Sequence, residues 1–241
     1  MIKYFDKIYK KGREKFFEEI KENLINNKKT FVVTANPETI MMAENNNNLK
    51  EALLDKDTII IPDGIGIVKG AKILKKDIKE TITGIELAEN LIKYCDEYNK
   101  NLFLFGAKKE VLKALKNKIN IEYPNVNIVG SIDGYVENKE NVMGQINKSD
   151  ADVILIALGI PQQEILIYNN LDNVSKGIFV GVGGSFDVLS GMKKRAPKFF
   201  IKFHLEWLYR ITKEPKRFKR FFESNIKYIF KVFKIRIKEV N

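Results

Sequence analysis

The chain has 241 residues, of which 44% are hydrophobic, and it carries a net charge of +11. Its single cysteine, Cys95, excludes an internal disulfide, and its single histidine, His204, argues against a zinc site or a Ser-His-Asp triad. The first residues are charged and no run approaches the ~20 apolar residues of a membrane span, so we expect a cytoplasmic protein without a signal peptide.

The positive charge is concentrated at the end of the chain. Residues 195–241 contain 14 Lys and Arg against 4 Asp and Glu, and they hold 11 of the 26 aromatic residues. The first 194 residues are close to neutral. This contrast predicts two parts, a neutral domain over 1–194 and a basic, aromatic appendage over 195–241.

Short apolar runs alternate with helical patterns through the first 194 residues. The expected strands are 30–36, 57–63, 101–107, 126–132, 152–159 and 177–184. The expected helices are 38–54, a segment starting at Ile65, 84–99, 107–120, 139–149 and 161–171. The strands are almost continuously apolar, which is typical of strands covered on both faces. We therefore predict a Rossmann-like, three-layer α/β domain with a mostly parallel sheet, followed by helices at 198–211 and 216–238.

Polar residues and glycines stand where these strands end, which is where open parallel sheets bind ligands. They are Thr34, Asn36, Asp63, Gly64, Gly106, Asp133, Gly159, Gln162, Gln163 and the run 181–184, with Gly183 at its centre. The turns "FLFGAKKE" and "GVGGSFD" would let a phosphate approach backbone N–H groups, although a simple tight turn is the alternative. Neither turn matches a dinucleotide or Walker motif, so the residues alone predict a nucleotide or phosphate ligand with its chemistry open.

Asp63 comes directly after an apolar strand and before Gly64. It either turns the chain and caps the next helix, or it serves as a general base that takes a proton from a hydroxyl group. The absence of histidine from the first 194 residues favours the second role.

Six strings occur in the order of a known family. They are "TANPETI", "PDGIGIV", "FLFGAKKE", "ADVILIALGIPQQE", "VGVGGSFDVLSGMKKRAP" and "LEWLYRITKEPKRFKR". Over roughly residues 5–222 the sequence resembles the WecG/TagA/CpsF family of bacterial glycosyltransferases.

The resemblance implies an inverting transfer, independent of metals and cofactors, from a UDP-sugar to a polyprenyl-diphosphate-linked saccharide in teichoic acid or exopolysaccharide synthesis. The best-studied branch of the family moves N-acetylmannosamine onto lipid-linked N-acetylglucosamine. By motif, Asp63 is the catalytic base. The implied substrate-binding residues are Thr34, Asn36, Gly64, Gly106, Gln163, Gly183, Arg210, Arg217 and Arg220, with the arginines clamping the diphosphate.

A lipid-linked acceptor gives the basic appendage a second expected role. Its aromatic residues would seat it on the inner face of the cell membrane, where anionic lipids attract Lys and Arg. The alternative is that they pack on the domain or on another subunit, since a homo-oligomer is possible. The aromatic residues are Phe199, Phe200, Phe203, Trp207, Phe218, Phe221 and Phe222.

The sequence also departs from the family pattern. "ETITGIEL" has Thr81 and Glu86 where arginine and aspartate are usual, which leaves the donor sugar open. Gln162, Asp133 and His204 replace lysine, histidine and glycine. Two alternative functions remain: a nucleic-acid-binding protein that uses the basic appendage, and an inactive relative that binds UDP-sugars.

Overall fold

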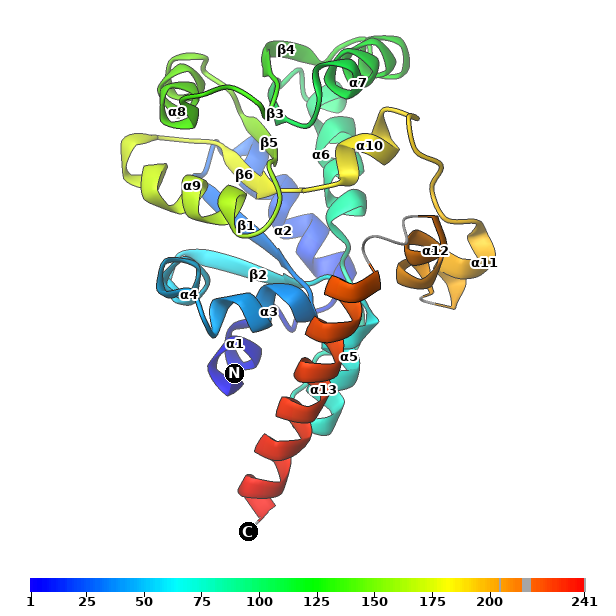
Figure 1. Ribbon diagram of the computed structural model, residues 1–241. Helices are drawn as coiled ribbons and strands as arrows, with labels where there is room; N and C mark the ends of the chain where they lie inside the picture. Colours follow the sequence, from blue (N-terminus) through cyan, green and yellow to red (C-terminus); the bar gives the residue numbers. More distant parts are fainter. Residues whose placement is uncertain (204, 214–217, 241) are drawn as a thin grey trace.

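A six-stranded, all-parallel sheet forms the centre of the computed structural model, which describes residues 1–203, 205–213 and 218–240 (Figure 1). The strands are β1 (Thr30–Ala35), β2 (Thr58–Pro62), β3 (Asn101–Gly106), β4 (Asn127–Ile132), β5 (Val153–Ala157) and β6 (Ile178–Gly181). They lie in the order β2-β1-β6-β5-β3-β4, and each neighbouring pair is parallel. The predicted α/β fold is confirmed.

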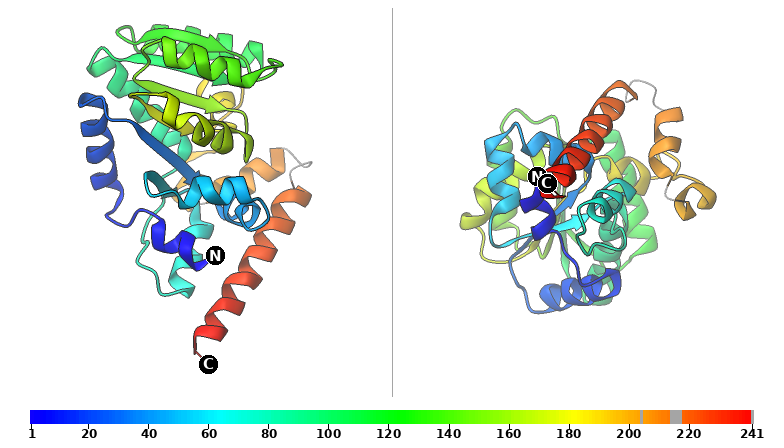
Figure 2. Two further views of the ribbon diagram at one scale, coloured as in Figure 1. Left: turned by 90° about the vertical axis from the view of Figure 1, so that its left-hand side faces the viewer. Right: turned by 90° about the horizontal axis from the view of Figure 1, so that it is seen from below.

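Helices cover both faces of this sheet, and each face has its own hydrophobic cluster. On one face lie α1 (Ile2–Lys7), α3 (Pro37–Ala43), α4 (Asn47–Leu54), α5 (Ile65–Ile73), α8 (Lys139–Lys148) and α9 (Gln162–Asn170), followed by a 3₁₀ turn at Leu171–Asn173. On the other lie α2 (Arg13–Ile25), α6 (Gly84–Glu97), α7 (Lys109–Glu122) and α10 (Ser185–Leu189). Figure 2 shows these three layers from two further sides.

The continuous apolar strands follow from this double cover. Every residue of β1, β5 and β6 is buried, whereas the edge strand β4 is partly exposed. The opposite edge, β2, is covered by the segment after α1, where the backbone N–H of Tyr9 donates to the carbonyl of Ile60 at 2.8 Å. That segment pairs with β2 as an isolated bridge and so protects its edge.

Two predicted helices are each broken into two. The 38–54 pattern divides into α3 and α4 because the side-chain oxygen of Asn46 accepts the N–H of Leu49 at 3.0 Å and starts a new helix. The 198–211 pattern divides into α11 (Lys198–Lys202) and α12 (Glu206–Lys213). There the N–H of Leu205 returns to the carbonyl of Phe200 at 2.7 Å and ends α11.

The last helix, α13 (Phe218–Val240), packs against α3 and α5. Its Tyr228 and Val232 are buried in the same hydrophobic cluster as Ile67 of α5. The carboxyl-terminal part of α13 projects past the sheet and its helices, while α11 and α12 lie on the side at which the strands end (Figures 1 and 2). The described residues contain no helix that is both long and apolar enough to cross a membrane.

Candidate functional site

The strand order places Asp63 and Asn36 at the ends of neighbouring strands. Ala35 of β1 pairs with Pro62 of β2, and each candidate is the next residue along its strand. The backbone N–H of Asp63 donates to the carbonyl of Ala35 at 2.8 Å, which extends the pairing by one residue. The half-buried carboxylate of Asp63 therefore starts from a fixed backbone position beside Asn36.

Gly64 turns the chain from Asp63 into α5. Its φ is +91°, a left-handed conformation that side chains rarely adopt, and no atom lies within 4 Å of the position of an added Cβ. The backbone angle, not crowding, is therefore what requires glycine here. The turn lets α5 begin at Ile65, two residues after the candidate base.

Asn36 is also the N-cap of α3. Its Oδ1 accepts the backbone N–H of Thr39 at 3.0 Å, and Thr39 Oγ1 in turn accepts the N–H of Asn36 at 3.2 Å. This reciprocal capping box fixes the side chain, so a substrate contact would come from its amide nitrogen. The same asparagine is thus both the cap of α3 and a predicted site residue.

Thr34 joins β1 to β6 beneath the start of α6. Its hydroxyl donates to the carbonyl of Gly181 at 3.2 Å, and only 7% of the residue is exposed. A Cβ added at Gly84 would lie 3.2 Å from Thr34 Cγ2, so the first turn of α6 rests on this threonine. The loop that precedes α6 reaches the same edge, because Ile82 N–H donates to the Pro62 carbonyl at 2.9 Å.

Gln163, at the start of α9, is 2% exposed and uses its carboxamide within the protein. Its Oε1 accepts the backbone N–H groups of Gly159 at 3.0 Å and Gly183 at 3.1 Å. Its Nε2 donates to Glu164 Oε1 at 2.8 Å. The expectation that Gln163 and Gly183 contact substrate stays a prediction, and in this structure each polar group named here already has a protein partner.

Glu164 is a residue that the sequence reasoning missed. It is 1% exposed, and burial raises the pKa of its carboxyl group to about 7. An acid in the first turn of a helix is usually exposed to solvent and stabilises the helix through its dipole. The sequence around Glu164 therefore gave no sign that this acid is buried. Its burial follows from the packing of α9 into the fold, where this helix contacts α4, α8, β1 and β6.

Gly106 lies away from Asp63 along the sheet. Strands β1, β6 and β5 separate its strand, β3, from β2. Its φ is +122°, and a Cβ would lie 2.4 Å from the carbonyl oxygen of Ala157. Close backbone packing accounts for this glycine, and its predicted contact with substrate remains a prediction.

Two of the three predicted arginines of the appendage belong to described helices. Arg210 belongs to α12 and Arg220 to α13, but their side chains lie outside the described structure. Arg217 and His204 lie outside the described residues altogether.

The residues that depart from the family pattern lie at several places in the structure. Glu86 forms an ion pair with Arg13 of α2, and Thr81 is half-buried in the loop before α6. Asp133 accepts the N–H of Tyr135 at 2.9 Å, and Gln162 is exposed.

Two other features lie apart from this edge. A hollow of about 230 Å³ has walls from α6, α7 and α10, including Lys93, Lys118 and Glu122, so it is not the candidate site. Within residues 1–203, 205–213 and 218–240, no group of three or more His, Cys, Asp or Glu side chains is placed to hold a metal ion.

The parallel sheet, with an acid and polar side chains at its strand ends, has the form of an α/β enzyme. The chain belongs to the glycosyl transferase WecG/TagA/CpsF family, whose model matches residues 6–241. It is therefore a glycosyltransferase.

Three similar proteins share the name N-acetylglucosaminyldiphosphoundecaprenol N-acetyl-beta-D-mannosaminyltransferase. The protein of that name from Bacillus spizizenii is 40% identical over 86% of this chain and 80% of its own length. The one from Bacillus subtilis strain 168 is 37% identical over 91% of this chain and 85% of its own length. The one from Staphylococcus aureus strain MW2 is 34% identical over 86% of this chain and 81% of its own length.

Proposed function

We propose that the protein transfers N-acetylmannosamine, or a related sugar, from a UDP-sugar to N-acetylglucosamine linked by a diphosphate to a polyprenyl lipid. The similarity to the three transferases, which extends over most of both chains, carries the proposal. The position of Asp63 at the end of β2, beside Asn36, supports it. The product would enter the synthesis of wall teichoic acid or an exopolysaccharide.

In the proposed reaction Asp63 is the general base. Its carboxylate takes the proton from the acceptor hydroxyl as that oxygen bonds to the anomeric carbon of the donor sugar. The bond from that carbon to the diphosphate breaks in the same step, so UDP leaves and the configuration inverts. One displacement requires one base, so no second carboxylate is needed.

The leaving diphosphate gains negative charge that must be stabilised. We assign this to Arg210, Arg217 and Arg220 of the appendage, because guanidinium groups bind phosphate oxygens with two parallel hydrogen bonds. With these cations in place the scheme needs neither a metal nor a cofactor. Residues 195–241 would then complete a site that the domain over 1–194 begins.

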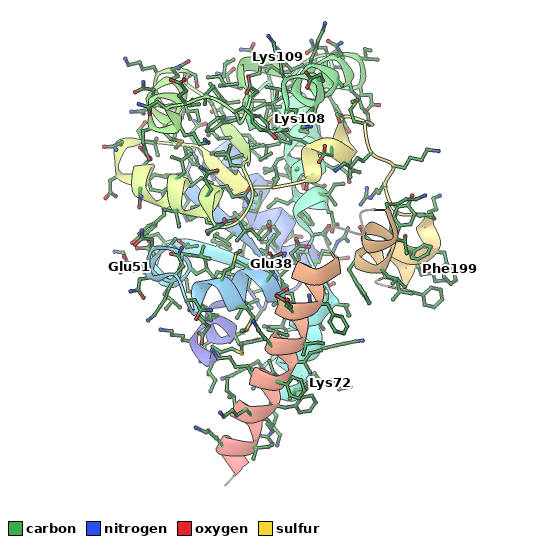
Figure 3. The ribbon with its side chains drawn as sticks, viewed as in Figure 1. Glu38, Glu51, Lys72, Lys108, Lys109 and Phe199 are labelled. Atoms are coloured by element: carbon green, nitrogen blue, oxygen red, sulfur yellow. The ribbon has the colours of Figure 1, made fainter. Side chains whose placement is uncertain are left out.

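We also propose that the appendage rests on the inner face of the cell membrane. Phe230 of α13 is 72% exposed, and Phe199 of α11 is 62% exposed at the outer edge of the molecule (Figure 3). Exposed lysines flank them, and anionic lipids attract each such charge by ~1 kcal/mol. Among the described side chains of residues 195–241, the exposed large apolar ones are Phe199, Phe203, Trp207, Leu208, Phe222, Ile229, Phe230, Phe233 and Ile237.

The test is UDP release from a panel of UDP-sugars with a short-chain lipid-diphosphate-N-acetylglucosamine acceptor. We expect acceptor-dependent turnover with UDP-N-acetylmannosamine, unchanged by EDTA, and a loss of about 100-fold or more in Asp63→Asn with UDP binding retained. Asp172→Asn is the matched control, because it neutralises an exposed acid in the 3₁₀ turn Leu171–Asn173, away from the candidate site residues.

The other outcomes separate the alternatives. UDP binding without turnover of any sugar would favour the inactive relative. Absence of UDP binding would contradict the site, and salt-sensitive binding of oligonucleotides that ignores Asp63→Asn would favour the nucleic-acid hypothesis.

A further inference from the structure

A buried hydrogen-bond network connects the acid Glu164 to the strand ends of the candidate site. Glu164 Oε1 accepts from Gln163 Nε2 at 2.8 Å. Gln163 Oε1 accepts the N–H of Gly159, which follows β5, and the N–H of Gly183, which follows β6. One carboxamide therefore joins the two glycine turns at the ends of neighbouring strands.

The network continues to β1. Gly181, the last residue of β6, accepts the hydroxyl of Thr34 at 3.2 Å. A Cβ at Gly181 would lie 2.5 Å from Gln163 Nε2, so this glycine makes room for the carboxamide. The turn after β6 is thus held from both sides, by Thr34 and by Gln163. Asn36 and Asp63 end the next two strands in the row.

Glu164 and the two glycine N–H groups together set which way this carboxamide faces. An amide side chain offers an acceptor at one end and a donor at the other, and the two ends have nearly the same shape. With the oxygen of Gln163 facing the two glycine N–H groups, its buried nitrogen needs an acceptor on the opposite side. Glu164 Oε1 is that acceptor. A flipped carboxamide would direct its N–H groups at two N–H donors.

Glu164 is buried, so its hydrogen bond with Gln163 is not the chance contact of an acid on the surface. Among the described residues, its Oε2 is buried and has no hydrogen-bond partner. Burying an acid with an unsatisfied oxygen is unfavourable, and burial raises the pKa of the group to about 7. An acid on the solvent-facing side of a helix would keep its carboxylate hydrated and would not meet this unfavourable burial.

We propose that Glu164 is a positioning residue for the transfer reaction: it orients Gln163, which holds the turns after β5 and β6 in the shape that the substrate site requires. The substrate part of this inference rests on the proposed function. The structural part does not, because the orientation of the turns can be measured without substrate.

The test uses the full chain with Glu164→Met, Glu164→Gln, Gln163→Met and the double variant Gln163→Met/Glu164→Met. Glu164→Met removes the acceptor at similar length, whereas Glu164→Gln keeps a side-chain oxygen. Glu110→Gln is the matched control, an exposed acid in the first turn of α7. The readouts are the amide hydrogen exchange rates of Gly159 and Gly183 by NMR, and kcat/KM for the donor.

We expect Glu164→Met to speed exchange at both glycines at least tenfold and to lower kcat/KM at least tenfold. Glu164→Gln should restore both to within about threefold of the wild type, because its oxygen accepts from Gln163. The double variant should be no worse than Gln163→Met, because Glu164 acts through Gln163.

Unchanged exchange in Glu164→Met, or additive losses in the double variant, would overturn the inference. If Glu164→Met does not fold, the exchange rates of Gly159 and Gly183 in Gln163→Met decide the matter. Unchanged rates in that variant would mean that the carboxamide does not hold the turns. If exchange responds as expected while the wild type transfers no sugar, the positioning role stands and the proposed function fails.

Discussion

The hydroxyl of Tyr228 occupies the place where a side chain on Gly70 would begin. A Cβ built on Gly70 lies 2.1 Å from the Tyr228 oxygen and 2.9 Å from its Cζ. That hydroxyl donates to the carbonyl of Gly66 at 3.1 Å, one turn earlier on α5. Gly66 and Gly70, four residues apart on α5, thus face Tyr228 of the last helix, α13. Helix α5 is the one that follows Asp63.

We expect Gly70→Ala to weaken this packing. Alanine normally favours a helix over glycine by about 1 kcal/mol, so a loss would report the clash with Tyr228. The free energy of unfolding should fall by about 1–3 kcal/mol, and trypsin should cleave within α13 faster. Chemical denaturation and timed proteolysis measure the two effects.

Gly144→Ala is the control for that change. Gly144 is an exposed glycine of α8 with no atom within 4 Å of an added Cβ, so alanine there should be neutral or stabilising by up to about 1 kcal/mol. Adding Tyr228→Phe to Gly70→Ala removes the nearest clashing atom and should recover part of the loss. Equal effects of Gly70→Ala and Gly144→Ala would contradict the packing argument.

Gly106→Ala should be more damaging than alanine at a glycine that is only strained. Gly106 combines a φ of +122° with backbone atoms of Ala157 at 2.4–2.8 Å from an added Cβ. We expect a loss of about 2 kcal/mol or more in the free energy of unfolding. Gly191→Ala separates the two causes, because Gly191 has a φ of +80° and no atom within 4 Å. A loss there as large as at Gly106 would show that strain alone explains both.

The sequence was informative where the signal is local. Continuous apolar runs predicted the six strands, and the residues at their ends predicted which side chains share an edge. Asp63 and Asn36 could be assigned to the same edge of the sheet from these patterns, whereas their place on neighbouring strands depends on the strand order β2-β1-β6, which the patterns did not predict. The break between α3 and α4 depended on which asparagine of a polar run caps a helix, and several asparagines in 44–49 were possible caps.

The long-range contacts could not be predicted in the same way. Gly66 and Gly70 carry no mark that they face Tyr228, which lies 162 residues after Gly66. Glu164 has the sequence context of an exposed helix-start acid, and it is buried by the tertiary packing of α9. Such roles depend on tertiary packing, which periodicity within one element does not encode.

The exposed aromatic face of α13 predicts a measurable membrane affinity. Phe230→Ser/Phe233→Ser removes two rings that are 72% and 50% exposed, and each buried ring is worth about 1.5–3 kcal/mol. In vesicle sedimentation with phosphatidylglycerol we expect a loss of at least about tenfold in binding. Ile121→Ser, an 81% exposed residue of α7, should leave binding unchanged. Equal binding by both variants would show that α13 does not insert.

The buried acid predicts how stability depends on pH. Burial raises the pKa of Glu164 from 4.5 to about 7, so between these values the folded protein keeps a proton that the unfolded chain has lost. The free energy of unfolding therefore falls as pH rises from 4.5 to about 7 and then stays lower. The shift corresponds to a total of about 3 kcal/mol.

Glu164→Gln removes this ionisation and keeps the acceptor for Gln163. Its free energy of unfolding relative to the wild type should therefore increase by about 2–3 kcal/mol between pH 5 and pH 8. Urea denaturation at several pH values measures the difference, with Glu110→Gln as an exposed control that should show almost no change. A constant difference between Glu164→Gln and the wild type across this range would mean that the carboxyl group titrates as an exposed acid. The burial of Glu164 beside Gln163 would then be wrong, because a solvated carboxylate has no reason to hold its proton near pH 7.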